Sequence, residues 1–157
     1  MRRFTAIVLL VSAAVASVVL AQSRDGAGPA TATAPSGVRF GHVDVFVDSG
    51  GASLAAYQCE ITATAGDVTL VGIEGGEHAA FKTPPYYDPK ALGQKRIILG
   101  ALNTGADLPR GKTRVARLMV QITGATRPAY DAKVQVAGSP DGKPTAATIS
   151  VSDSEGA

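Results

Sequence analysis

The stretch YQCEITAT, residues 57–64, decides the fold class of this 157-residue chain. Apolar or small side chains occupy every second position in it: Tyr57, Cys59, Ile61 and Ala63. Strict alternation with polar residues is typical of a β-strand that buries one face and leaves the other in water. The stretch therefore predicts a half-buried strand with Cys59 on its inner side.

Strand patterns continue on both sides of this stretch. The further β-rich segments are residues 38–47, 68–73, 96–102, 114–123, 130–136 and 148–152. In one of them the side chains that share a phase are Tyr130, Ala132, Val134 and Val136. Short strands in such close succession favour two packed antiparallel sheets over a helical or mixed fold.

Turn residues separate these segments. Pro precedes Gly by two residues at 109–111 and again at 140–142, which suits turns with Pro at the first corner. The one helical signal is residues 88–93, where Asp88 can cap a single turn that begins at Pro89. We therefore expect an all-β fold, an antiparallel β-sandwich of about eight strands with at most one short helical turn.

The N-terminus has the pattern of a secretory signal. Arg2 and Arg3 precede residues 4–21, which carry no charge and end in small residues suited to cleavage after Ala21. The first 21 residues are therefore interpreted as a signal peptide, with an uncleaved membrane anchor as the alternative. The protein is then secreted, periplasmic or held in the cell envelope, and it contacts a membrane only if the segment stays uncleaved.

The rest of the chain divides into three parts. Residues 22–37 are rich in Ala, Thr, Pro, Gly and Ser, which indicates a flexible linker. Residues 38–153 form the predicted sandwich domain, and residues 154–157 form a tail. Of the 15 Lys and Arg residues, two lie in the leader, so the other 13 balance the 13 Asp and Glu. A balanced charge without a basic patch argues against a nucleic-acid partner.

Few residues point to catalysis. The chain has one cysteine, which the strand pattern buries, and two histidines. Glu74, Glu77 and His78 lie close together in the sequence, but zinc sites need three or four ligands at defined spacing, and this spacing does not match. No glycine-flanked nucleophile leads into a helix. We therefore expect neither a metal, nor a cofactor, nor an enzyme.

The most unusual stretch is GIEGGEHAAFKTPPYYDPKAL, residues 72–92, a long loop for a sandwich. The Pro84-Pro85 pair stiffens it, and long structured loops on a β scaffold are where binding residues gather. The candidate binding residues are Glu74, Glu77, His78, Phe81, Tyr86, Tyr87 and Asp88. In the alternative interpretation, Phe81 and Tyr86 only plug the end of the sandwich. The binding site would then move to a sheet face such as the one with Gln58, Glu60 and Thr62.

With the strands laid out, residues 43–152 resemble the cohesin-like group of bacterial sandwich domains, which shares a superfamily with cellulose-binding modules. The stretches that carry the resemblance are VDVFVDSG (43–50), LAAYQCEITATAGDVTLVGIEGG (54–76), RIILGAL (96–102), LPRGKTRVARLMVQITG (108–124), DGKP (141–144) and TISVS (148–152). The resemblance implies a jelly-roll or immunoglobulin-like sandwich. Cohesins bind dockerins through one face of the sandwich, so it also implies recognition of another protein.

These observations favour an exported, non-catalytic binding module. The expected partner is another exported protein, possibly dockerin-like. One alternative is a carbohydrate-binding module in which Tyr86 and Tyr87 form the platform for a polysaccharide. The other is a structural envelope protein without a discrete ligand.

Overall fold

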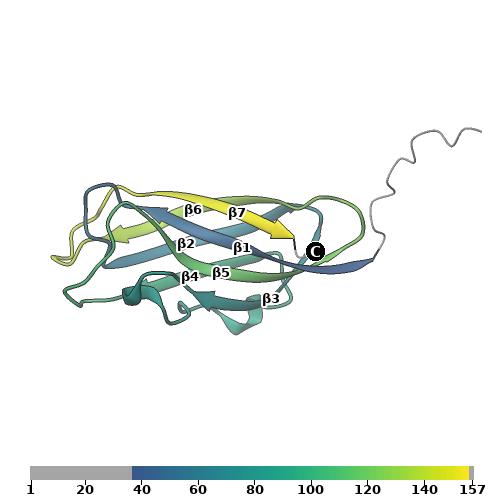
Figure 1. Cartoon of the computed structure of the whole chain (residues 1–157), viewed down its shortest axis with the longest axis horizontal. Helices are drawn as coiled ribbons and strands as arrows, with labels where there is room; N and C mark the ends of the chain where they lie inside the picture. Colours follow the sequence, from purple (N-terminus) through teal and green to yellow (C-terminus); the bar gives the residue numbers. More distant parts are fainter. Residues whose placement is uncertain (1–36, 156–157) are drawn as a thin grey trace, which may run out of the picture. The chain divides into compact units, whose positions relative to one another are not determined.

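A computed structural model describes residues 37–155, with the side chains of residues 37–154, and these form a sandwich of two antiparallel sheets (Figure 1). One sheet has four strands in the order β3-β5-β1-β7, and the other has three in the order β4-β2-β6. The strands are β1 (Val38–Asp48), β2 (Ala56–Ala65), β3 (Asp67–Gly75), β4 (Arg96–Leu102), β5 (Lys112–Thr123), β6 (Ala129–Gly138) and β7 (Thr148–Glu155). The predicted signal peptide and nearly all of the predicted linker lie outside the described residues.

The core lies between the two sheets, where the alternating residues of their inner faces meet. Val43, Val45 and Val47 of β1 have no exposed surface. Cys59 of β2 also has none, and Tyr57 and Ile61 on either side of it are buried. The period of two in the sequence therefore corresponds to the inner and outer faces of each sheet. This confirms the all-β sandwich.

Bulges shift the alternation in several strands, β5 and β6 among them. In β5 both Val115 and Ala116 are buried, because the pairing with β1 shifts at Val45/Phe46. In β6 the pairing with β2 shifts at Gln58/Cys59, so that Val134 opposes Cys59 while Val136 opposes Gln58. A bulge inserts one extra residue and so reverses the faces beyond it. As a result Val136 is 53% exposed, whereas the shared phase predicted it on the same face as Val134.

The described residues differ from the sequence-based expectation in three further details. They contain seven strands, one for each segment that the sequence indicated, where about eight were expected. They contain two 3-10 turns, Ala79–Phe81 and Pro89–Ala91, instead of at most one. Asp88 caps the second turn as predicted, and His78 caps the first with a side-chain nitrogen, a signal that the sequence analysis did not use. β7 continues to Glu155, two residues beyond the predicted boundary of the domain.

Candidate functional site: an apolar outer face on the three-stranded sheet

The segment between β3 and β4 folds back tightly against the sandwich. A Cβ atom on Gly75 would lie 1.9 Å from the carbonyl oxygen of Lys82, so only glycine fits there. The next residue, Gly76, donates its N–H to the carbonyl of Phe81 at 2.7 Å. The two consecutive glycines therefore let the loop return over the end of β3.

Phe81 closes the core at this return. Its side chain is 3% exposed, and its ring meets Tyr57 edge-on at 5.2 Å between centroids. The Tyr57 hydroxyl donates in turn to the carbonyl of Val115 at 3.1 Å. Phe81 is thus the plug that the alternative interpretation described, and almost none of its side chain is exposed.

Glu77 and His78 hold the loop in place. The Oε1 atom of Glu77 accepts a hydrogen bond from the backbone N–H of Arg114 at 2.9 Å. The Nδ1 atom of His78 accepts from the N–H of Ala80 at 3.2 Å, and its Nε2 lies 3.7 Å from Oδ1 of Asp107. Both side chains therefore have partners within the domain.

Glu74 and Asp88 lie at opposite ends of the loop. Glu74 is near the end of β3, opposite Arg117 of β5. Asp88 caps the second 3-10 turn by accepting a hydrogen bond from the N–H of Lys90 at 3.0 Å. The structure therefore does not gather the acidic candidates into one site.

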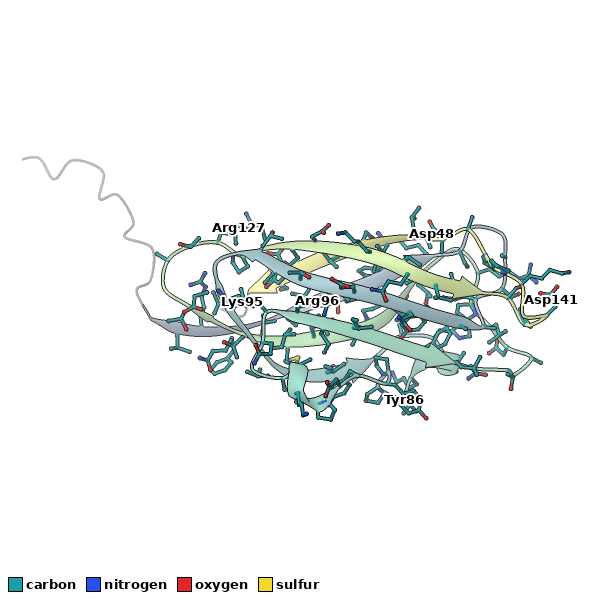
Figure 2. All side chains as sticks on the ribbon, turned by 180° about the vertical axis from the view of Figure 1, so that it is seen from behind. Asp48, Tyr86, Lys95, Arg96, Arg127 and Asp141 are labelled. Atoms are coloured by element: carbon teal, nitrogen blue, oxygen red, sulfur yellow. The ribbon has the colours of Figure 1, made fainter. Side chains whose placement is uncertain are left out.

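The two tyrosines have different environments. Tyr87 is half-buried and packs against the core. Tyr86 is 85% exposed, although its backbone is held firmly. Its N–H donates to the carbonyl of Gly100 at 2.8 Å, and the N–H of Gly100 donates to the carbonyl of Tyr86 at 2.9 Å. Tyr86 therefore extends the three-stranded sheet by one residue beyond β4 (Figure 2).

This bridge aligns Tyr86 with a row of outward-facing residues. Gly100 is paired with Gln58 of β2, which is paired with Val136 of β6. In the neighbouring row, Leu102 is paired with Ala56, and Ala56 with Gly138. We call these seven positions the apolar half of the outer face: Tyr86, Gly100, Gln58, Val136, Leu102, Ala56 and Gly138.

Three large apolar side chains are exposed together in this half. The large exposed apolar residues among the described side chains are Val38, Phe40, Val71, Tyr86, Leu102 and Val136. Three of these six are in the apolar half, where Leu102 is 70% exposed. Clustered exposed apolar residues mark interaction surfaces more often than isolated ones do.

Two hollows flank Leu102. One has a volume of about 790 Å³ and lies among Ala56, Val136, Gly138 and the 139–147 segment. The other has a volume of about 330 Å³ and is lined by Phe81, Pro84, Pro85 and Tyr86, among others. Leu102 contributes to both, so it forms a ridge between two depressions that could receive apolar side chains of a partner.

The other half of the outer face is polar. Arg96 donates two hydrogen bonds to the Glu60 carboxylate, at 2.8 and 2.7 Å, and Gln135 donates a third at 2.9 Å. The hydrogen bond from Arg96 is the main reason that the pKa of Glu60 is lowered. Asp131 and Lys133 form a further ion pair at 3.4 Å. The charges in this half are therefore neutralised within the sheet.

The outer face of the four-stranded sheet carries a separate charged cluster. Nε and Nη2 of Arg117 donate to the two carboxylate oxygens of Asp44 at 2.7 and 2.9 Å, and Arg114 lies 3.6 Å away. The hydrogen bond from Arg117 outweighs the desolvation of Asp44 and lowers its pKa. This cluster joins β1 to β5, so it has a structural role.

Within residues 37–155, no group of three or more His, Cys, Asp and Glu side chains is arranged to hold a metal ion. In the same part of the chain, no helix has the length and apolar character needed to cross a membrane.

Comparison with known proteins gives no match: no protein-family model, no curated protein and no solved structure matches this chain.

Sequence reasoning selected Tyr86 but not Leu102 or Val136. Leu102 ends an almost entirely apolar strand, RIILGAL, in which both faces look alike in the sequence. Val136 reaches the outer face only because of the bulge in β6. The face with Gln58, Glu60 and Thr62, considered as a fallback in the sequence analysis, is the same face that Tyr86 extends.

Proposed function

We propose that this domain is an exported, non-catalytic module that binds another protein through the apolar half of the outer face. The observation that carries the proposal is the grouping of Tyr86, Leu102 and Val136 around two hollows on one sheet. Aromatic and aliphatic side chains that fill a partner's pockets supply most of the binding energy in protein interfaces.

The rigidity of the face supports the same proposal. Tyr86 is fixed by two backbone hydrogen bonds, and Leu102 belongs to a paired strand. Because the backbone at both positions is already ordered, little backbone entropy is lost there on binding. The polar candidates Glu77, His78 and Asp88 are engaged in hydrogen bonds of the fold, so the proposed binding surface does not include them.

A protein partner fits this surface better than a polysaccharide. Sugar-binding platforms use exposed aromatic rings. Tyr87 packs against the core, so of the two adjacent tyrosines only Tyr86 offers an exposed ring. Leu102 and Val136 offer aliphatic surface, which suits apolar side chains of a protein. The resemblance to cohesin-like domains also favours a protein partner. Export is supported separately by the two arginines followed by an uncharged apolar run at the N-terminus.

Site-specific cross-linking tests the proposal. A photoreactive group attached through Leu102→Cys should give discrete protein adducts in the cells that produce the chain. The matched control is Phe40→Cys, a position that is 59% exposed on the other sheet. Equal adducts from both positions would refute the assignment of this face. Binding to a polysaccharide panel that Tyr86→Ala abolishes would support the carbohydrate alternative instead.

A further inference from the structure

The edge strands of the two sheets differ in how their free edges are covered. At β3, the N–H of Leu70 donates to the carbonyl of Gln94 at 3.2 Å, and the N–H of Gly93 donates to the carbonyl of Leu70 at 2.8 Å. At β4, Tyr86 bridges the edge at Gly100. The segment between these two strands therefore covers an edge of each sheet on one side of the sandwich.

On the opposite side, β6 and β7 lie side by side as edge strands of different sheets (Figure 1). The edge of β6 is irregular and partly covered. Its pairing with β2 has two register shifts, it contains Lys133, and the N–H of Thr145 donates back to the carbonyl of Ala137 at 2.9 Å. Bulges, lysines and covering loops are features with which proteins keep an edge strand from pairing.

β7 has none of these three features. It is paired with residues Gly41 to Asp48 of β1 in continuous register, and it contains no Lys, Pro or Gly. Within residues 37–155, no backbone hydrogen bond outside the sheets involves β7. The backbone N–H and C=O groups of β7 that point away from β1 are therefore open to an added strand.

The side of the core next to β7 is incompletely covered. Ile149 and Val151 lie opposite the buried Val47 and Val45 of β1, so they face inward, yet both are only half-buried. Val134 of β6 packs against the same core and is also half-buried. A strand added to β7 would place every second side chain beside Ile149 and Val151, where an apolar side chain removes more of this surface from water.

The larger hollow connects this edge with the apolar half of the outer face. The hollow of about 790 Å³ is lined by Leu102 and Val136 of the apolar half and also by Val134 and Ala147. Ala147 immediately precedes β7. A protein that contacts Leu102 and Val136 can therefore continue around the end of β6 to the edge of β7.

We propose that β7 accepts an extended segment of the partner protein as an additional strand, antiparallel because that pairing is the more stable per residue. The segment has apolar side chains at every second position, beside Ile149 and Val151, and polar ones between them, beside the exposed Ser150. Its main chain supplies the hydrogen bonds, and the alternate side chains supply selectivity. Asp153, whose carboxylate lies 3.9 Å from Arg127, ends the apolar part of the edge. The inference rests on the proposed function, because it states what form part of that partner takes.

Amide hydrogen exchange of the full chain, followed by NMR, tests the pairing. The probe is a synthetic peptide in which Val alternates with Thr, with Lys at each end for solubility. Millimolar peptide should slow exchange at alternate residues of β7 at least tenfold and leave β3, whose edge is covered at Leu70, unchanged. The same peptide with N-methyl groups on alternate residues keeps its side chains but loses those donors, so it should give no protection.

Three results would overturn strand addition. The first is exchange in β7 that the peptide does not change. The second is slow exchange throughout β7 in the dilute chain alone, because this chain would then cover the edge itself. The third is protection of β7 that rises with the concentration of the chain in the absence of peptide, because a second copy would then be the occupant.

Val151→Lys tests whether the partner uses this edge. An inward-pointing lysine prevents pairing at an edge strand. In the cells that produce the chain, Val151→Lys should therefore lower the yield of adducts from Leu102→Cys at least tenfold. The matched control is Val71→Lys, at a position of β3 that is 45% exposed, which should leave the yield unchanged. Equal yields from the two folded variants would contradict a role of β7, and if Val151→Lys does not fold, the exchange experiment on the unaltered chain decides.

The two proposals can fail separately. If Leu102→Cys gives adducts but the peptide does not protect β7, strand addition is wrong and the binding face stands. If the peptide protects β7 but no adducts depend on Leu102, the binding face is wrong and the edge of β7 stands as the binding surface.

Discussion

Tyr86 and Gly100 are joined by a pair of backbone hydrogen bonds, of 2.8 and 2.9 Å, that attaches the β3–β4 loop to the edge of β4. This pairing holds Tyr86 in place while leaving its ring 85% exposed. Gly100 adds no side chain beside it. A residue whose backbone is fixed by the fold and whose side chain is in water has the properties of a binding anchor.

Replacement of Tyr86 by alanine should separate binding from stability. The backbone bridge does not depend on the side chain, and an exposed ring contributes little to folding, so Tyr86→Ala should change the unfolding free energy by only about 0.5 kcal/mol. Loss of an anchor at an interface costs about 2 kcal/mol or more of binding energy. Thermal melting measures the first effect, and the yield of cross-linked adducts from Leu102→Cys chains with and without Tyr86→Ala measures the second. A large fall in melting temperature would show that Tyr86 is structural.

Phe81→Ala should have the opposite effect. The ring fills the core against Tyr57, so its removal should cost about 3–5 kcal/mol of stability. Chemical denaturation measures this loss. Under conditions in which the variant remains folded, most of the binding should be retained, because the Phe81 side chain is only 3% exposed where it lines the smaller hollow. A stability change below about 1 kcal/mol would argue against its role as the plug.

Cys59 provides a test of the strand register. Burial raises the pKa of its thiol to about 12, so the reactive thiolate is scarce at neutral pH. Native protein should therefore react with a thiol reagent far more slowly than unfolded protein does. Cys59→Ser should lower stability by about 1–3 kcal/mol, because it buries a hydroxyl without an assured partner. Rapid labelling of the native chain would place Cys59 on the outer face of β2.

The Asp44–Arg117 pair predicts a loss of stability in acid. The pKa of Asp44 is lower in the folded chain than in the unfolded chain, where it is about 3.9. Its contribution is therefore complete above the unfolded-state value and is lost as the pH falls through the folded-state value. Asp44→Asn should lower the unfolding free energy at pH 7 by about 1–2 kcal/mol. The difference between the two proteins should shrink below about pH 4, which denaturation at several pH values measures.

The arrangement of strands could be predicted from the sequence because the inner faces follow a strict alternation. The valines of β1 and the alternating run in β2 have no other good interpretation, and each lies where the pattern placed it. The turn after Asp88 was also predictable, because Asp-Pro is a recognisable helix start.

The candidate site was only partly predictable, and the reasons are local. A single extra residue in β6 turns Val136 outward, and no residue type in that strand predicts the bulge. Phe81 and Tyr86 look equivalent in the sequence, since both are aromatic residues in one loop. The tight return of the loop at Gly75 buries Phe81, whereas the bridge to Gly100 leaves the Tyr86 ring exposed.

Hydroxyl-radical footprinting of Tyr86 is the most direct test of the claim that the apolar half of the outer face binds protein. The oxidation rate of Tyr86 is measured in the purified chain alone and again in its complex with the protein captured through Leu102→Cys, with Phe40 as the internal reference in each sample. We predict strong protection of Tyr86 on association and no change at Phe40. Protection of Phe40 alone, or an unchanged rate at Tyr86 in a demonstrated complex, would contradict the account.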